Sequence, residues 1–325
     1  MKNIFITGGA GYVGSVLVPH LLNKGYRITA LDLMIYGETL PQHSNLNLVK
    51  GDIRDQNLLK KIIKNIDVVI HLACISNDPS FELNPKLGKD INLNSFVPLV
   101  EISKKNNVKK FIYASSSSVY GVKNEKNVHE EMSLEPLTDY SRFKADCEKI
   151  LLKYKSDNFI TVVLRPATVC GYSPRQRLDL VVNILTNLAF HKREITVLGG
   201  GQLRPNIHIQ DMARAYELFI EIADKKINGQ IFNIGFENKT VDQLATNVKK
   251  IVGEDIKILK SVSNDNRSYH ISSDKIFKLL EFKPKFTISD AINDLKKAFE
   301  NKLLIDPLNN ENYYNIKKMK NFNLA

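Results

Sequence analysis

A glycine-rich turn near the start of the chain constrains the fold more than any other feature of the sequence. Residues 2–14 read KNIFITGGAGYVG, where an apolar run ends in a turn that carries Gly8, Gly11 and Gly14. The next residues are amphipathic, and a second apolar run, RITALD, ends at Asp32. Strand, glycine turn, helix, strand and acidic residue, with about 20 residues from turn to acid, form the pattern of a dinucleotide-binding unit.

The residue types of this unit fit the chemistry of a dinucleotide. Glycine allows a positive φ and lets the backbone approach a pyrophosphate without a Cβ atom in the way. The following helix presents free N–H groups and the positive end of its dipole to the phosphates. Asp32 can accept hydrogen bonds from both hydroxyls of an adenosine ribose and would repel a 2′-phosphate, which favours NAD over NADP. The alternative is a tight loop in an α/β protein that binds nothing.

Apolar runs and amphipathic segments alternate from the first residues to Cys170. Strands are expected at 4–7, 27–32, 45–52, 67–73, 109–121 and 160–169, and helices at 15–24, 55–65, 84–105 and 138–155. Pro98, inside the longest of these helices, predicts a kink or a break. The alternation predicts an α/β fold with a doubly wound, parallel (Rossmann) sheet and right-handed crossovers.

The regular alternation fades after Gly171. Helices are expected at 179–191, 211–224 and 240–252, and short strands at 195–198 and 230–234. We therefore expect an NAD-binding Rossmann domain at 1–170, which carries the catalytic residues, and a smaller α/β substrate-binding portion at 171–325, interwoven with the first. The tail after Asn301 carries paired aromatics and is expected to pack on the body of the protein.

Charge and hydropathy narrow the range of partners. The formal net charge is +11, but the lysines are scattered over the polar sides of expected helices and the tail, so no nucleic acid partner is expected. No segment approaches ~18 uninterrupted apolar residues, so no membrane partner is expected. Residues 1–10 are expected to form the first strand, so no signal peptide is expected. A cytoplasmic location is predicted.

The cysteines and histidines do not predict a metal site. Cys74, Cys147 and Cys170 are odd in number and widely separated, which indicates neither a disulfide framework nor a metal cluster and fits a reducing compartment. His71 and His208 lack the spacing of metal ligands.

Tyr140 and Lys144 give the second strong signal. They stand four residues apart in YSRFK, and residues i and i+4 of a helix share one face with Cβ atoms roughly 5–6 Å apart. A lysine ammonium so placed favours the tyrosinate over the phenol, as would the positive ring of oxidised nicotinamide. A tyrosine with a reference pKa of about 10 could then act as a general base near neutral pH. The alternative is a surface tyrosine packed along a lysine stem.

Four serines, residues 115–118, follow the fifth expected strand. Open α/β sheets build their sites at the carboxyl ends of parallel strands. A serine hydroxyl there can hold a reacting oxygen beside Tyr140. The alternative is a polar loop.

Together these motifs carry a family resemblance. In chain order they are T-G-G-A-G-Y-V-G (7–14), Asp32, G-D-I (51–53), H-L-A (71–73), S-S-S-S-V-Y-G (115–121), Y-S-R-F-K (140–144), L-R-P-A-T-V-C-G (164–171) and H-I-Q-D (208–211). Over residues 1–290 the chain resembles the extended short-chain dehydrogenases/reductases of the NAD-dependent nucleotide-sugar epimerase/dehydratase group. The resemblance implies a nucleotide-diphosphate sugar as substrate and a homodimer formed through two helices of the sheet domain.

The resemblance also implies roles for individual residues. The catalytic triad falls on Ser116, Tyr140 and Lys144, with Ser116 chosen by counting back from V-Y-G. Cofactor contacts fall on Gly8, Gly11, Tyr12, Val13, Gly14, Asp32, Asp52, Ile53, Leu72, Ala73, Cys74, Asn92, Tyr140, Lys144 and Pro166.

Members of the group share proton and hydride removal at sugar C4 and differ in the later steps of the reaction. The 4,6-dehydratases carry an Asp-Glu pair after the catalytic Ser or Thr, where this chain has Ser117 and Ser118. The 3,5-epimerase/reductases carry a cysteine at the position of Ser117. The remaining possibilities are a C4 epimerase and a C4 dehydrogenase or ketoreductase. An alternative of another class is a non-catalytic NAD-sensing or RNA-binding protein on the same fold.

Segment 167–180, ATVCGYSPRQRLDL, is expected to determine which sugar the protein binds. It resembles members that act on nucleotide-activated heptoses or deoxysugars, and Thr168 stands where ordinary UDP-glucose 4-epimerases have Asn. Arginines are expected to hold the substrate diphosphate. The candidate substrate residues are Ser117, Ser118, Thr168, Arg175, Arg177, Asn183, Arg204 and Arg267.

Overall fold

Seven parallel strands form the central sheet of the protein, in the order β10-β6-β5-β4-β1-β2-β3. The computed structural model describes residues 1–76, 78–262, 268 and 270–321. The strands are β1 (Asn3–Thr7), β2 (Arg27–Asp32), β3 (Leu46–Lys50), β4 (Val68–His71), β5 (Lys110–Ala114), β6 (Ile160–Pro166) and β10 (Gln230–Ile234). The predicted doubly wound parallel sheet is confirmed. The strand order reverses between β1 and β4, and open α/β sheets bind ligands at such a switch point.

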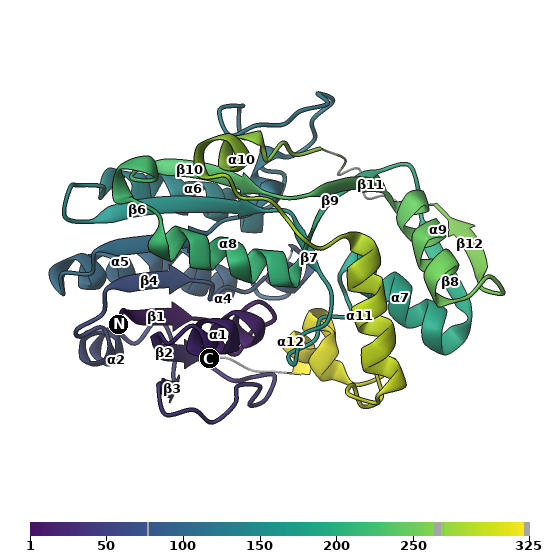
Figure 1. The fold of residues 1–325 in the computed structure, drawn as a ribbon, viewed down its shortest axis with the longest axis horizontal. Helices are drawn as coiled ribbons and strands as arrows, with labels where there is room; N and C mark the ends of the chain where they lie inside the picture. The colour runs from purple at the N-terminus through teal and green to yellow at the C-terminus, as the bar shows by residue number, and fades with distance from the viewer. Residues whose placement is uncertain (77, 263–267, 269, 322–325) are drawn as a thin grey trace.

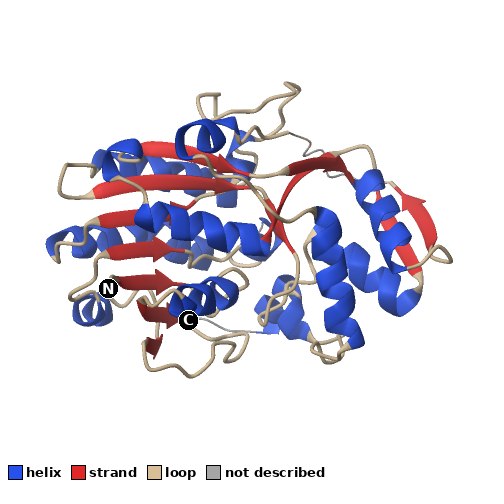
Figure 2. Cartoon of the chain, in the orientation of Figure 1, coloured by secondary structure: helices blue, strands red, loops and turns tan. Residues whose placement is uncertain are grey.

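Helices cover both faces of this sheet (Figures 1 and 2). The alternation of side chains along β1 divides the core: Ile4 and Ile6 belong to one buried cluster and Phe5 to the other. Two helices, α1 (Gly14–Asn23) and α8 (Ile209–Glu221), pack on the first face, and α2 (Gln56–Ile62), α5 (Phe96–Lys105) and α6 (Asp139–Lys153) on the second. Buried strands with apolar side chains on both faces explain the continuous apolar runs in the sequence.

The long helix expected at 84–105 is interrupted. It divides into α4 (Pro85–Lys89), a π-helical turn η1 (Asp90–Asn94) and α5. The Ser95 N–H donates to the carbonyl of Asp90, five residues back, at 3.1 Å. Pro98 lies in the first turn of α5, where its missing N–H leaves no bond unmade, so the break precedes the proline.

A smaller part of the protein lies beyond the carboxyl ends of the strands (Figure 1). It contains a three-stranded sheet of β7 (Thr168–Cys170), β9 (Leu203–His208) and β11 (Glu237–Thr240), and a two-stranded sheet of β8 (Glu194–Leu198) and β12 (Lys257–Ser261). Its core joins α7 (Val181–Lys192), α9 (Val241–Val252) and α11 (Ile288–Glu300).

The chain returns to the large sheet after Gly171. Helix α8 packs on α1, and β10 pairs with β6 from Gln230 to Ile234. Strand 230–234, which the sequence assigned to the smaller portion, is therefore the seventh strand of the Rossmann sheet. Its apolar residues Phe232 and Ile234 are fully buried, and this burial requires a neighbouring strand and covering helices.

Three short helices complete the described chain. They are α3 (Asp78–Glu82), α10 (Asp274–Leu280) and α12 (Asn315–Asn321). Helix α12 contacts α3, so the described part of the chain after Asn301 packs on the body as expected. Across the described ranges, none of the helices combines the length and the apolar character needed to cross a bilayer.

Candidate active site

A cleft of about 740 Å³ lies at the carboxyl ends of the parallel strands and is lined by residues of both the large sheet and the smaller part. Most of the residues proposed from the sequence line it. They are Gly8, Gly11, Tyr12, Val13, Gly14, Asp32, Ile53, Leu72, Ala73, Cys74, Ser116, Ser117, Ser118, Tyr140, Lys144, Pro166, Thr168, Arg175, Arg177 and Arg204. Three do not line the cleft, namely Asp52, Asn92 and Asn183, and Arg267 lies outside the described residues.

The glycine turn forms one end of the cleft. Gly8 has φ of 71°, and a Cβ atom there would lie 2.7 Å from the main-chain nitrogen of Ala73. Its N–H donates to the carbonyl of Leu31 at 2.7 Å, which ties the turn to β2. A Cβ atom on Gly14 would overlap the carbonyl oxygens of Gly8 and Gly9. The turn is therefore as close-packed as glycine permits, and the first turn of α1 faces the cleft.

Asp32 closes β2 beside this turn. Its carboxylate accepts hydrogen bonds from the N–H groups of Ala10 at 3.0 Å and Met34 at 2.8 Å, one on each oxygen. Burial raises the pKa of Asp32, and the two N–H groups oppose that rise. Each oxygen keeps further acceptor capacity on the cleft side, as the hydroxyls of an adenosine ribose require. The glycine cradle and this carboxylate fit the adenosine half of NAD.

Ser116, Tyr140 and Lys144 meet at the opposite end of the cleft. The Lys144 ammonium donates to the carbonyl of Ala114, the last residue of β5, at 2.6 Å and lies 5.9 Å from the centre of the Tyr140 ring. Ser116 and Tyr140 both line this end of the cleft, and the Ser116 side chain lowers the pKa of Tyr140. A capping box between Thr138 and Ser141 starts α6 and fixes Tyr140 in its first turn. The three residues proposed as a catalytic triad are thus brought together.

The groups around Tyr140 shift its pKa in opposite directions. Burial raises the pKa of Tyr140 well above its usual value, and the charges of Cys74 and Asp78 raise it further. The Arg177 guanidinium and the hydrogen bond from Ser116 lower it. Without a bound cation Tyr140 is a phenol, so its use as a base requires additional positive charge in the cleft.

The four serines have different environments. Ser115 also borders the cleft, and its hydroxyl donates a hydrogen bond to the buried carboxylate of Glu148. Ser116 caps a short 3₁₀ turn, where its Oγ accepts from the N–H of Ser118 at 3.1 Å and from the Ser118 hydroxyl at 2.9 Å. Ser117 is buried and lines the cleft with its neighbours.

Asp52, Asn92 and Asn183 position the walls of the cleft. The Asp52 carboxylate binds the guanidinium of Arg54, with Oδ2 2.7 Å from Nη2. The Asn92 amide accepts from the N–H of Ile75 at 2.8 Å and donates to its carbonyl at 3.0 Å, so η1 holds the loop after β4.

Asn183, in the smaller part, also holds a wall of the cleft in place. Its side chain accepts from the N–H of Gly171 at 3.0 Å and donates to the Tyr12 hydroxyl at 3.0 Å and to the Arg177 carbonyl at 2.8 Å. The Tyr12 hydroxyl in turn donates to the Gly171 carbonyl at 2.8 Å. Asn183 therefore joins the glycine turn to the segment that follows β7.

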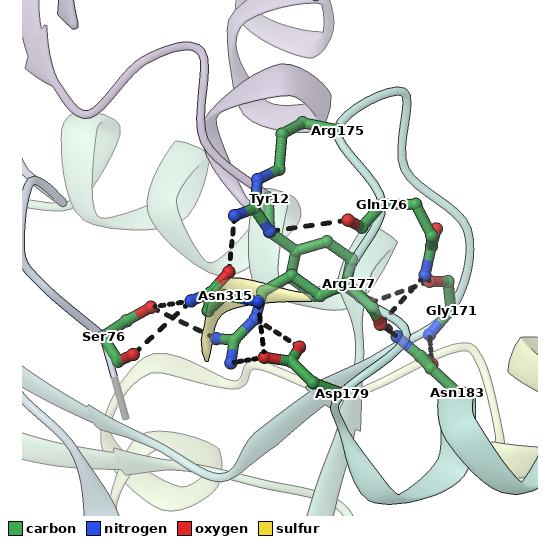
Figure 3. A network of polar contacts seen from close by, with 9 residues as sticks. All are labelled: Tyr12, Ser76, Gly171, Arg175, Gln176, Arg177, Asp179, Asn183 and Asn315. Carbon is green, nitrogen blue, oxygen red and sulfur yellow. Dashed lines mark hydrogen bonds and ion pairs between the residues drawn. The ribbon is translucent and has the colours of Figure 1, made fainter. Parts of the chain in front are cut away.

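A polar network connects two arginines of that segment to the C-terminal helix (Figure 3). Arg177 donates to both carboxylate oxygens of Asp179, at 2.9 and 3.1 Å, and to the Ser76 hydroxyl at 3.3 Å. Asn315, the first residue of α12, accepts from Arg175 at 2.5 Å and donates to the Ser76 hydroxyl at 2.9 Å. Both arginines line the cleft, and Asn315 lies between Ser76 and Arg175 (Figure 3).

Several cleft residues were not proposed from the sequence. Tyr36, Ser76, Asp78, Asp179 and Asn315 all line it. Asp78 begins the short helix α3 and Asp179 lies in the loop after β7, and the sequence gives no signal that either one turns inward. Asn315 lies more than a hundred residues from its partners, so only the fold brings it to them.

The described cysteines and histidines have no common site. All three cysteines are free, and across the described residues no three His, Cys, Asp or Glu side chains group as metal ligands. His71 is buried beside Lys144, where burial, aided by that charge, lowers its pKa to about 3.

Known proteins resemble this chain over nearly its whole length. The UDP-glucose 4-epimerase of Lactobacillus helveticus is 27% identical over 303 residues, which cover 87% of this chain and 92% of that protein. The structure of the Thermotoga maritima UDP-glucose 4-epimerase with UDP-glucose has a TM-score of 0.84 at 27% identity and covers 93% of this chain and 100% of that one. The structure of MoeE5 with UDP-glucose and NAD has a TM-score of 0.83 at 25% identity, with coverage of 93% and 100%.

A family model covers most of the chain. The model of the NAD dependent epimerase/dehydratase family matches residues 4–235, which span the glycine turn, the catalytic candidates and the seventh strand of the sheet. The resemblance stated from the motifs is thereby confirmed. The chain is an enzyme that uses NAD, and it belongs to the NAD dependent epimerase/dehydratase family.

Proposed function

We propose that this enzyme is a nucleotide-sugar 4-epimerase that acts by Tyr-assisted hydride transfer at sugar C4. The observation that carries the proposal is the contact of Ser116, Tyr140 and Lys144 at the carboxyl end of β5. A hydroxyl, a phenol and an ammonium in this arrangement can bind one substrate oxygen and move its proton.

The residues divide the chemistry among them. Ser116 and Tyr140 both hydrogen-bond the C4 hydroxyl, and Tyr140 removes its proton as the carbonyl forms. When bound, NAD supplies the acceptor of the C4 hydride and later its donor. Burial raises the pKa of Tyr140; the Lys144 ammonium, 5.9 Å from the centre of its ring, and the positive charge of a bound oxidised nicotinamide would lower it. Tyr140 returns the proton when the ketone is reduced on its other face.

The residues beside Ser116 support epimerisation over dehydration. The dehydratases of the resembling group carry the acids that eliminate water at the two positions after the catalytic Ser or Thr, and here those positions are Ser117 and Ser118. Ser118 donates to Ser116 instead and helps to orient its hydroxyl.

Arg204 is proposed to bind the substrate diphosphate. It stands on β9 of the smaller part and lines the cleft. The Lactobacillus relative is a UDP-glucose 4-epimerase, and the Thermotoga structure contains UDP-glucose, which supports a nucleotide sugar in this part of the cleft. Thr168 and Ser118 also line it and are proposed as sugar contacts.

We further propose a homodimer in the cytoplasm. The free cysteines fit a reducing compartment. In the resembling group the dimer forms through two helices of the sheet domain, and light scattering of the purified protein measures the mass directly.

The decisive experiment combines a substrate panel with a tyrosine variant. The enzyme is incubated with UDP-, GDP-, CDP- and dTDP-sugars, while NMR identifies products and nicotinamide absorbance follows net redox change. We expect isomerisation of one sugar without accumulation of NADH. Tyr140→Phe should lower turnover by ~10²–10⁴-fold and leave NAD bound. Tyr154→Phe, at the other end of α6, is the matched control and should retain activity.

Other outcomes contradict the proposal in distinct ways. Stoichiometric NADH would identify a C4 dehydrogenase, such as one acting on a GDP-heptose or deoxysugar. Full activity of Tyr140→Phe would exclude the tyrosine mechanism. Absence of turnover with every sugar would favour a non-catalytic NAD-binding protein.

A further inference from the structure

We propose that Arg175 binds the diphosphate of the cofactor, not that of the substrate, and that Asn315 of the C-terminal helix α12 holds it in place. The segment after β7 and the C-terminal helix would then form the outer wall of the cofactor site. The proposal rests on NAD as the cofactor and is independent of the reaction at the sugar.

Arg175 is a buried cation without an anionic partner. Only 3% of its surface is exposed, and across the described residues no carboxylate forms an ion pair with it. Its guanidinium donates to the Asn315 amide oxygen at 2.5 Å and to the Gln176 carbonyl at 3.4 Å, and it lies 3.6 Å from the centre of the Tyr36 ring. All three partners are neutral.

The hydrogen-bond capacity of Arg175 is also unfilled. Its Nε is buried and has no hydrogen-bond partner among the described residues. Burial lowers the pKa of this guanidinium to about 10, with the charge of Arg177 adding to the effect. A buried charge of this kind is costly unless it is paired. An anion with oxygens suited to the planar guanidinium, as in a diphosphate, would supply the missing partner.

The position of Arg175 identifies which diphosphate this is. The main-chain N–H of Arg175 donates a hydrogen bond to the hydroxyl of Ser15, in the first turn of α1, at 3.3 Å. Ser173, two residues earlier, donates to the Tyr12 carbonyl at 2.8 Å. The Arg175 charge also acts on Asp32 at the end of β2. The main chain of Arg175 therefore packs on the start of α1, and its guanidinium lies against the Tyr36 ring, on the side of the cleft where its charge acts on Asp32.

The first turn of α1 and Arg175 line the same cleft. The N-terminal turn of a helix binds phosphate through its free N–H groups and dipole. Arg175 would add a charged group to the same cleft. The sequence grouped Arg175 with the substrate arginines because it stands in the segment that is expected to select the sugar. In the structure this part of the segment turns back onto α1.

Arg177 differs from Arg175 in its pairing. It forms an ion pair with Asp179 and bonds Ser76, and its charge acts on Tyr140. Its charge is thus already balanced within the protein. Arg175 is the arginine of this segment that needs an external anion.

Asn315 ties Arg175 to both sides of the cleft. It is 3% exposed, and besides Arg175 it bonds the Ser76 hydroxyl, while its N–H donates to Asp179 at 3.2 Å (Figure 3). Ile316 and Met319 of the same helix line the cleft. The C-terminal helix therefore bridges the loop after β4 and the segment after β7, across the expected path of the cofactor.

The experiment compares Arg175→Gln with Arg204→Gln in the full chain freed of dinucleotide. Calorimetry measures the affinity for ADP-ribose, adenosine and UDP. ADP-ribose carries the cofactor diphosphate, adenosine lacks it, and UDP carries the diphosphate of a nucleotide-sugar substrate. Arg175→Gln should lower the affinity for ADP-ribose by ~10–100-fold, which is the effect of one charge-assisted hydrogen bond. The affinities for adenosine and UDP should not change. Arg204→Gln should lower the affinity for UDP and leave the affinities for ADP-ribose and adenosine unchanged.

Stability provides a second readout that guards against a folding defect. Because Arg175→Gln removes an unpaired buried charge, the unliganded variant should melt no lower than the parent. The rise in melting temperature on addition of NAD should be smaller than in the parent. Loss of UDP binding with normal ADP-ribose binding would overturn the proposal, as would equal affinities of variant and parent for both ligands.

The role of the C-terminal helix is tested by Asn315→Ala. We expect faster NAD release with the same order of ligand preferences as the parent. Asn321→Ala, at the end of the same helix where the side chain bonds Glu311, is the matched control and should release NAD at the parental rate. An unchanged release rate in Asn315→Ala would remove the C-terminal helix from the proposal. These binding measurements need no turnover, so their failure and the failure of the proposed epimerase activity are separable.

Discussion

Glu148 and Arg165 form a buried ion pair directly behind the active-site serines. The Arg165 guanidinium donates to both oxygens of the Glu148 carboxylate, at 2.6 and 3.0 Å, and neither side chain is more than 3% exposed. Glu148 follows Lys144 by one turn of α6 and accepts a hydrogen bond from Ser115. The pair therefore connects α6, which carries two catalytic candidates, to β6, the neighbour of the strand β5 that precedes the third, Ser116.

We expect removal of one member of this pair to destabilise the protein strongly. Glu148→Gln leaves the Arg165 charge buried without a counterion, which costs about 3–5 kcal/mol. Urea unfolding should report a lower midpoint with an unchanged slope. The double variant Glu148→Gln/Arg165→Met should lose less stability than the sum of the single variants, because it leaves no unpaired charge. A Glu148→Gln protein within 1 kcal/mol of the parent, on the order of a surface substitution, would contradict this expectation.

The sequence predicted the parts of the fold that local patterns encode. The glycine turn, the buried strands and the spacing of Tyr140 and Lys144 each lie within one short segment, and the structure has them as expected. The match of the family model from residue 4 to 235 agrees with that prediction.

The features that the sequence could not predict depend on contacts between distant segments. Strand β10 joins the large sheet because β6 offers a free edge, which no pattern within 230–234 reveals. Arg175 was grouped with the substrate residues by its place in the chain, whereas its environment comes from Tyr36 and Asn315. Polarity and charge alone do not say which anion such a residue faces.

The pH dependence of activity should respond to Asp78. This carboxylate lies near Tyr140, and its negative charge raises the pKa of the phenol. Asp78→Asn removes the charge, so the pKa of Tyr140 falls and the tyrosinate forms at lower pH. The acidic limb of the kcat/KM profile should therefore move to lower pH. Glu82→Gln, on the exposed side of the same helix, is the control and should not move it. A shift of the Asp78→Asn limb to higher pH would show that the charge does not act on the base.

His71 should make the folded state sensitive to acid. Its imidazole shares a 2.7 Å hydrogen bond with Thr7, and burial lowers its pKa from 6.5 to about 3. Between these values the unfolded chain binds a proton at His71 and the folded protein does not. Stability therefore decreases as the pH falls from 6.5 towards 3, by up to about 5 kcal/mol for a shift of this size.

The contribution of His71 is measured by difference. Unfolding free energies of His71→Gln and of the parent are compared across this pH range. The variant should lose less stability on acidification, because glutamine does not titrate. His129→Gln replaces an exposed histidine and should follow the parent. Parallel curves for His71→Gln and the parent would mean that His71 is not kept neutral by burial.

The glycine turn offers a test that separates backbone strain from close packing. Gly8 and Gly25 both have positive φ, 71° and 86°, so alanine at either site costs roughly 1–2 kcal/mol of conformational strain. A Cβ atom on Gly25 meets no other atom within 4 Å, whereas one on Gly8 would lie 2.7 Å from the main-chain nitrogen of Ala73. That contact is with backbone, so relief requires movement of the turn or of the loop after β4.

Gly8→Ala and Gly25→Ala should therefore differ in NAD affinity more than in stability. Both should unfold at lower urea concentration than the parent, with Gly8→Ala the lower of the two. Calorimetry should find that Gly25→Ala binds NAD as the parent does. Gly8→Ala should bind it at least ~10-fold more weakly, because a displacement of the turn costs about 1.4 kcal/mol or more of phosphate contact. Equal NAD affinity in the two variants would mean that the turn can accept a side chain in the bound state. In that case Gly8 would not be needed for a close approach of the backbone to the diphosphate.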